Sequence, residues 1–289
     1  MHIEITGNKN IDKLEKLLFE ILSILFLYLG GYPRIKNIIS NNNVKDISNL
    51  LIKYNTSEIF FKESLLLCDI DSNTINETVL KNYRQIKQTP ISSLQYLVSK
   101  DYESVITNHK ITLLLHIIEG LVDSSLRPSL KRELKIKLKT EEKIGNFMAA
   151  TYHICKHYFF NYHRKYKFDI LPLLKVSQNE FLRILTDTRN WYSHYFDETQ
   201  KLDRLDDGKE IMIYLHIIYF TIRLFLMDSI QVECDESRIR DYYYMLHDWI
   251  LEVKYGKSNP LKSNTYKINK SLKELEDLFL QSGYEKPGQ

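Results

Sequence analysis

Apolar residues recur every three or four positions along most of the chain, the spacing that places side chains on one face of an α-helix. The first such stretch covers residues 11–29, and Gly30 and Gly31 end it. Five more follow after Pro90, at residues 111–122, 144–155, 177–196, 211–227 and 235–250. This pattern predicts a mostly α protein whose centre is a bundle of about five helices.

Two of these stretches carry further signals. Ser177 followed by Glu180 forms a capping box, which predicts that a helix begins there and runs to about Phe196. Residues 211–227 are almost wholly apolar, so this helix is predicted to lie in the middle of the bundle, where every face is buried.

The helical period weakens between Ile35 and Tyr83, where short apolar runs alternate with asparagine and aspartate clusters. Such runs predict short strands or irregular structure. We therefore expect a helical bundle with a small N-terminal α+β accessory region. Pro90 closes a polar stretch and is taken as the boundary. The predicted domains are the accessory region 1–90, the bundle 91–255, and a linker with a C-terminal helix, 256–289.

Composition narrows the possible function classes. The 40 Lys and Arg residues against 37 Asp and Glu give a net charge of +3, which excludes a uniformly basic nucleic-acid binder. Three cysteines without C-x-x-C spacing argue against a disulfide framework or a cysteine zinc site, so we expect a reducing cytoplasm. The apolar run from Leu17 to Leu29 is well short of the roughly 20 residues that span a bilayer, and no membrane association is expected.

The candidate chemistry lies on the helix predicted from Ser177. On a helical wheel, Ile184, Leu185, Thr188, Trp191, Tyr192 and Tyr195 fall on the core side with Phe181. The opposite side is predicted to face solvent as one polar strip; it carries Arg183, Arg189, Asn190, Ser193 and His194.

This strip suits phosphodiester cleavage without a metal. RNA carries its own nucleophile, the 2′-hydroxyl, so an enzyme needs a proton-transfer group and a cation for the phosphorane charge. His194 is the predicted base or acid, since imidazole exchanges protons near neutrality. Arg189 can hold two phosphate oxygens at once. Asn190, one turn before His194, is predicted to orient the imidazole.

Arg189, Asn190 and His194, in the form R-N-x-x-x-H, resemble the signature of the HEPN superfamily, the higher eukaryotes and prokaryotes nucleotide-binding domain. With an upstream helix containing Glu119, residues 91–255 look most like the HEPN domain of ApeA-like abortive-infection proteins. The resemblance implies a metal-independent endoribonuclease of a bacterial toxin or phage-defence system, with RNA as substrate and no cofactor. Its expected products are a 2′,3′-cyclic phosphate and a 5′-hydroxyl.

The resemblance also implies a homodimer in which two motifs face one another. Arg189 and His194 lie about 140° apart on the helical wheel, a poor arrangement for both to reach one phosphate. A two-fold dimer would bring Arg189 of one subunit to His194 of the other. We therefore expect a composite site.

Other candidate residues are weaker. Arg240 and His247, separated by six residues with Asp241 after the arginine, match the spacing but lack the asparagine. His153 and His157 have metal-pair spacing, but no third ligand has matching spacing, so no metal site is expected. Arg183 and the basic residues of two runs are further candidates for RNA contact. A solvated basic face explains the runs equally well. The candidates in the runs are Lys131, Arg132, Lys135, Arg164 and Lys165.

Two other functions remain open. The first is a non-catalytic HEPN module, antitoxin-like, that binds nucleotides or a partner protein. Members regulated by nucleotidyltransferases often carry tyrosine two residues after the histidine, where this chain has Phe196. The second is a helical interaction scaffold, which gains support only if the strip around His194 is buried.

Overall fold

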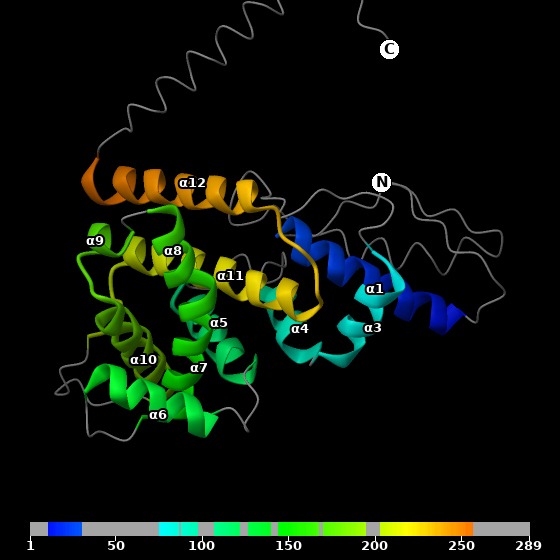
Figure 1. Cartoon of the computed structure of the whole chain (residues 1–289), viewed down its shortest axis with the longest axis horizontal. Coiled ribbons are helices and arrows are strands. Elements are labelled where there is room, and N and C mark those ends of the chain that lie inside the picture. Colours follow the sequence, from blue (N-terminus) through cyan, green and yellow to red (C-terminus); the bar gives the residue numbers. More distant parts are fainter. Residues whose placement is uncertain are drawn as a thin grey trace, which may run out of the picture. The chain divides into compact units, whose positions relative to one another are not determined.

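A computed structural model describes residues 11–30, 75–86, 88–97, 107–121, 127–139, 144–167, 170–194 and 203–256. All the regular elements in these ranges are helical, which confirms a mostly α protein for this part of the chain (Figure 1). They are α1 (Ile11–Leu29), α3 (Glu77–Gln85), α4 (Gln88–Leu97), α5 (Thr107–Leu121), α6 (Arg127–Leu138), α7 (Asn146–Cys155), the π-helix η2 (Lys156–Phe160), α8 (Asn161–Tyr166), α9 (Ile170–Leu174), α10 (Gln178–His194), α11 (Gly208–Ser229) and α12 (Glu236–Tyr255).

The chain divides into two compact units, Met1–Tyr243 and Tyr244–Gln289, so the division falls within α12. The first unit contains every other described helix and all the contacts discussed below, except where His247 and Gly256 are named. The prediction of about five helices after residue 90 is too low, because α6 and α9 were not expected. The buried hydrophobic residues of α6 are only Leu130 and Leu134, too few to show a clear period.

Helix α11 forms the centre of the first unit, as its apolar sequence predicts. It contacts α5, α7, η2 and α1, and Figure 1 shows it running beside α5 and α7. Nearly all its side chains from Ile211 to Met227 are buried. By length and composition α11 is apolar enough to cross a membrane, and 83% of that apolar window is buried inside the protein.

Aromatic rings join α10 and η2 to this central helix. The rings of Phe181 on α10 and Tyr214 on α11 stack with centroids 5.0 Å apart. Phe159 of η2 lies 5.3 Å from Phe181. Offset and tilted ring pairs at these separations contribute dispersion and quadrupole attraction in addition to burial. The contacts fix the start of α10, the helix that carries the candidate chemistry.

Helix α1 is held against α11 by a buried arginine. The guanidinium of Arg223 donates from Nε and Nη2 to the carbonyl of Leu27, at 3.1 and 2.8 Å, and from Nη2 to that of Tyr28 at 3.0 Å. Carbonyls in the last turn of a helix have no partner within the helix, and a cation there is favourable. Tyr219 adds a hydrogen bond from its hydroxyl to the carbonyl of Gly30, at 2.8 Å.

Two predictions for the N-terminal region need correction. Residues 77–83 are not strand or irregular but belong to α3, which begins with Asn76 accepting a hydrogen bond from the Val79 amide at 3.0 Å. Only Val79 and Tyr83 of α3 are buried, and its nine residues are mostly polar, so its sequence offered too few apolar positions to predict a helix. Pro90 ends the polar stretch but does not interrupt the helix, because it lies in the first turn of α4, where a missing N–H costs nothing. Residues 35–74 lie outside the described ranges.

We expect Gly30→Ala to destabilise the protein more than Gly256→Ala does. Both glycines have positive φ angles, +74° and +60°, and an L-residue there costs about 1–2 kcal/mol. A Cβ on Gly30 would lie 2.4 Å from Nη1 of Arg223, whereas one on Gly256 would meet nothing within 4 Å. Urea unfolding of both variants measures the difference. Equal losses of stability would show that the contact of Arg223 with the end of α1 contributes little.

Candidate active site

The predicted capping box begins α10. The amide of Ser177 donates to Oε2 of Glu180 at 2.6 Å, and the amide of Glu180 donates to Oγ of Ser177 at 3.2 Å. Because these hydrogen bonds favour the charged carboxylate, they lower the pKa of Glu180. The helix extends to His194, and residues 195 and 196 lie outside the described part of the chain.

The predicted core side of α10 is confirmed in part, since Ile184, Trp191 and Tyr192 are half-buried and Tyr195 lies outside the described residues. Phe181, Leu185 and Thr188 are buried. Thr188 is satisfied in this position because its Oγ1 accepts a hydrogen bond from the amide of Leu205 at 3.0 Å. The Tyr192 hydroxyl donates to the carbonyl of the same residue, Leu205, at 3.1 Å. These two contacts hold the segment that precedes α11 against α10.

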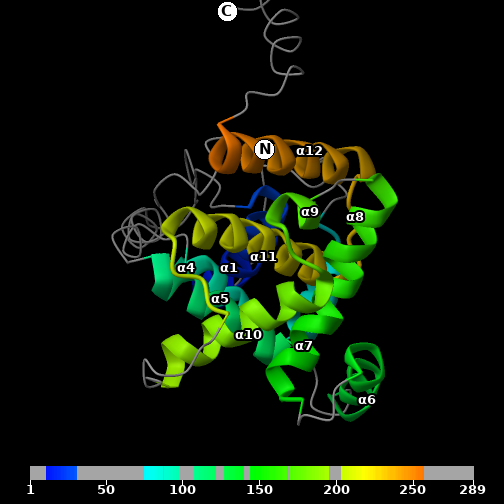
Figure 2. The ribbon, with the colours of Figure 1, turned by 90° about the vertical axis from the view of Figure 1, so that its left-hand side faces the viewer.

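The opposite side of α10 differs from the prediction, because Arg189 does not face open solvent. Only 17% of its side chain is exposed, and its Nη2 lies 3.0 Å from Oε2 of Glu119 on α5. Helices α5 and α7 both contact α10 (Figure 2). A helical wheel separates one buried side from one exposed side, whereas α10 is covered on two sides. Arg183 is exposed as predicted.

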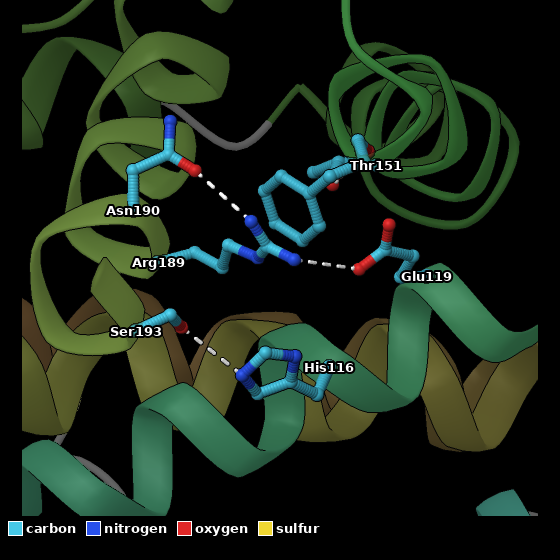
Figure 3. A network of polar contacts seen from close by, with 7 residues as sticks. His116, Glu119, Thr151, Arg189, Asn190 and Ser193 are labelled. Atoms are coloured by element: carbon cyan, nitrogen blue, oxygen red, sulfur yellow. Dashed lines mark hydrogen bonds and ion pairs between the residues drawn. The ribbon is translucent and has the colours of Figure 1, made fainter.

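Three neighbours fix the orientation of the Arg189 guanidinium. Besides the ion pair with Glu119, Nη1 donates to Oδ1 of Asn190 at 3.2 Å. The guanidinium carbon also lies 5.6 Å from the centre of the Phe147 ring, within cation–π range. Figure 3 shows Arg189 between Asn190 and Glu119. The cation is therefore held in place before any ligand arrives.

Asn190 acts on the arginine in this structure, which differs from its predicted role of orienting His194. Its Oδ1 accepts from Arg189. The side chain of His194 lies outside what the structure describes, so a contact between Asn190 and His194 stays a prediction. The same holds for the predicted approach of Arg189 to His194 across a dimer.

A second pair of side chains links α5 and α10 next to the ion pair. Oγ of Ser193 lies 3.1 Å from Nε2 of His116, an exposed residue. Sequence reasoning did not single out His116, and it cited Glu119 only as part of the upstream helix. The available signal was weak: His116 and Glu119 are polar positions three residues apart within the apolar second half of the helix.

The polar side of α10 opens onto a cleft of about 610 Å³. Arg183, Arg189 and Asn190 all line it, so the structure brings these predicted residues together. Glu119 on α5, Asn146 and Phe147 at the start of α7, and the end of α6 at Leu138 complete most of its wall. Cavities of roughly 300–1,000 Å³ accommodate small organic ligands, a range that includes a nucleotide.

The remaining basic candidates lie elsewhere. Arg132 and Lys135 are exposed on α6, where Lys131 is half-buried, and Arg164 and Lys165 are exposed on α8. None of these five lines the cleft. Lys165 is 2.5 Å from Oε1 of Glu236, so its charge is partly neutralised.

The alternative pair, Arg240 and His247, is divided between the two compact units, with Arg240 in the first and His247 in the second. Arg240 lies 3.8 Å from Asp241, and His247 lies 3.4 Å from Asp248, each pair being neighbours in the chain.

His153 and His157 have ring centroids 4.9 Å apart. Burial, and then the nearby charges of His157 and Lys156, lower the pKa of His153. Within the described ranges, no three His, Cys, Asp or Glu side chains are grouped so as to hold a metal ion.

Comparison of the chain with known protein families, with curated proteins and with solved structures finds no match. The chemistry of the site therefore rests on its own geometry: an oriented guanidinium, paired with Glu119, and a second cation, Arg183, line one cleft together with the carboxylate of Asp187. Such an arrangement can bind an anionic group such as a phosphodiester.

We expect a double-mutant cycle with Glu119→Ala and Arg189→Ala to give a coupling energy of about 1–2 kcal/mol, since side chains in contact couple in this range. Their side chains are 30% and 17% exposed, so solvent screens the pair only partly. The control cycle uses Glu236→Ala and Lys165→Ala, whose side chains are 67% and 48% exposed and which should couple by less than about 1 kcal/mol. Urea unfolding supplies the free energies, and equal couplings would contradict the expectation.

Proposed function

We propose that this chain is a metal-independent endoribonuclease of a bacterial defence or toxin system that acts in the cytoplasm. The observation that carries the proposal is the guanidinium of Arg189, held by Glu119 and Asn190 on the wall of a cleft that also contains Arg183. The similarity of Arg189, Asn190 and His194 to the HEPN signature supports the same activity.

The proposed reaction needs no group beyond the protein and the RNA. The 2′-hydroxyl loses its proton to a base and attacks the adjacent phosphorus, and the bond from phosphorus to the 5′-oxygen breaks. The leaving oxygen takes up a proton, giving a 2′,3′-cyclic phosphate and a 5′-hydroxyl. His194 exchanges one of these protons, and Arg189 stabilises the negative charge that develops on the phosphorane.

The contacts of Arg189 suit this role. The hydrogen bonds to Glu119 and Asn190 hold two of its nitrogens, Nη2 and Nη1, in fixed positions. Glu119 acts as a positioning residue, because it fixes the direction of the guanidinium. A donor that is oriented before the reaction stabilises the transition state without the cost of reorganisation. Arg183 is exposed on the wall of the cleft and is suited to a neighbouring phosphate.

A homodimer remains part of the proposal, with Arg189 of one subunit serving the same phosphate as His194 of its partner. The rival proposal is a non-catalytic module that binds a nucleotide, and the volume of the cleft, about 610 Å³, favours it as well. The two differ in one outcome: the module binds nucleotides or RNA and leaves the RNA chain intact.

We expect Arg189→Ala and His194→Ala each to lower the rate of RNA cleavage by at least about 100-fold, the usual loss when a charge-stabilising donor or a proton-transfer group is removed. Arg189→Lys should rescue little, because lysine lacks the planar pair of donors. His109→Ala, at an exposed position on α5 outside the cleft, is the control. Purified protein and total RNA on a sequencing gel give the measurement. Full activity of the His194 variant would refute its assignment.

Cleavage should persist in EDTA at an unchanged rate. The reason is that the transition-state charge is assigned to a guanidinium, Arg189, and the nucleophile belongs to the RNA. Rates measured after dialysis against chelator, with and without added Mg²⁺ or Mn²⁺, test this expectation. A strict requirement for either ion in the cleavage step would contradict the proposed mechanism.

A further inference from the structure

A second histidine lies beside the oriented arginine. His116 is exposed on α5, and its Nε2 is 3.1 Å from Oγ of Ser193 on α10. Figure 3 shows its ring next to the group formed by Arg189 and Glu119. His116 and Ser193 are not among the residues that line the cleft, but each lies one helical turn from a residue that does, Glu119 on α5 and Arg189 on α10.

The position of His116 follows from how the two helices meet. Glu119 contacts Arg189, and His116, three residues earlier on α5, contacts Ser193, four residues later on α10. The two contacts run in opposite order along the helices, so α5 and α10 are antiparallel here. Residues three or four apart on a helix share a face. His116 and Glu119 therefore face α10 together, and Arg189 and Ser193 face α5.

The reaction proposed above requires two proton transfers on opposite sides of one phosphorus. The attacking 2′-oxygen and the leaving 5′-oxygen are roughly in line with the phosphorus between them, as in phosphoryl transfer generally. One imidazole cannot lie beside both oxygens at the same time. A site that accelerates both transfers needs a second group that exchanges protons near neutral pH, and histidine is the residue suited to this task.

We propose that His116 is a second catalytic residue of this site and performs the proton transfer that His194 does not. This inference rests on the proposed ribonuclease function. One imidazole accepts the proton of the 2′-hydroxyl as the oxygen–phosphorus bond forms. The other, in its protonated form, gives a proton to the 5′-oxygen as its bond to phosphorus breaks. Ser193 orients the ring of His116, and Arg189 stabilises the charge that develops on the phosphorane.

The test compares cleavage of one short RNA by the wild-type chain and by His116→Gln and His116→Ala, at protein concentrations far above that of the RNA. We expect both variants to be at least about 100-fold slower, with unchanged melting temperature and unchanged affinity for RNA. His109→Gln, an exposed histidine on the same helix, should match the wild type. Ser193→Ala should lose less activity than either His116 variant, because it removes only the orienting hydrogen bond.

A second substrate separates the two transfers. When sulfur replaces the bridging 5′-oxygen at the scissile phosphate, the leaving thiolate needs no proton. Recovery of the His116→Gln rate on this substrate assigns His116 as the acid, and an equal defect on both substrates assigns it as the base.

If the wild type cleaves RNA and the folded His116 variants cleave it within about twofold of that rate, the role of His116 is refuted and the ribonuclease proposal stands. If the wild type cleaves no RNA, both proposals are overturned.

Discussion

The burial of α11 is the constraint on which the rest of the first unit depends. A helix that is apolar on every side gains stability only when neighbours cover all of it, and α1, α5, α7 and η2 contact it. Its two buried ionisable groups are accommodated differently. Arg223 keeps its charge by binding the last carbonyls of α1, whereas burial lowers the pKa of His216 to about 3 and keeps it neutral. Arg223 therefore favours the packing of a helix C-terminus, the end of α1, against this part of α11.

The candidate site is a consequence of this packing. Helix α5 buries Ile111, Leu114 and Ile118, and two of its polar residues, His116 and Glu119, meet α10. Helix α10 is in turn anchored to α11 by aromatic contacts near its start. The polar residues of α5 and α10 are thus brought together because the apolar face of each helix packs against other helices.

The packing of α5 against α10 changes the chemistry expected of Arg189. An arginine on an open helix surface moves among rotamers and is screened by water, so its interactions contribute little. With 17% of its side chain exposed and an acidic partner at 3.0 Å, Arg189 is oriented and partly desolvated. A charge in such surroundings acts more strongly on a phosphate that enters the cleft. The basic residues of α6 and α8 lie outside the cleft, and their charges remain those of an exposed surface.

The sequence by itself determined the features that depend on residues close together in the chain. The capping box of Ser177 and Glu180, the glycine at the end of α1 and the apolar α11 were all predicted correctly, because their signals lie within one or a few helical turns. Helix α3 was missed because it is short and mostly polar, with only two buried residues, Val79 and Tyr83. Only the tertiary structure decided that Arg189 is half-buried and that His116 lies beside it. Arg189 and Glu119 are 70 positions apart, and a pattern along one helix carries no information about which neighbour covers its polar side.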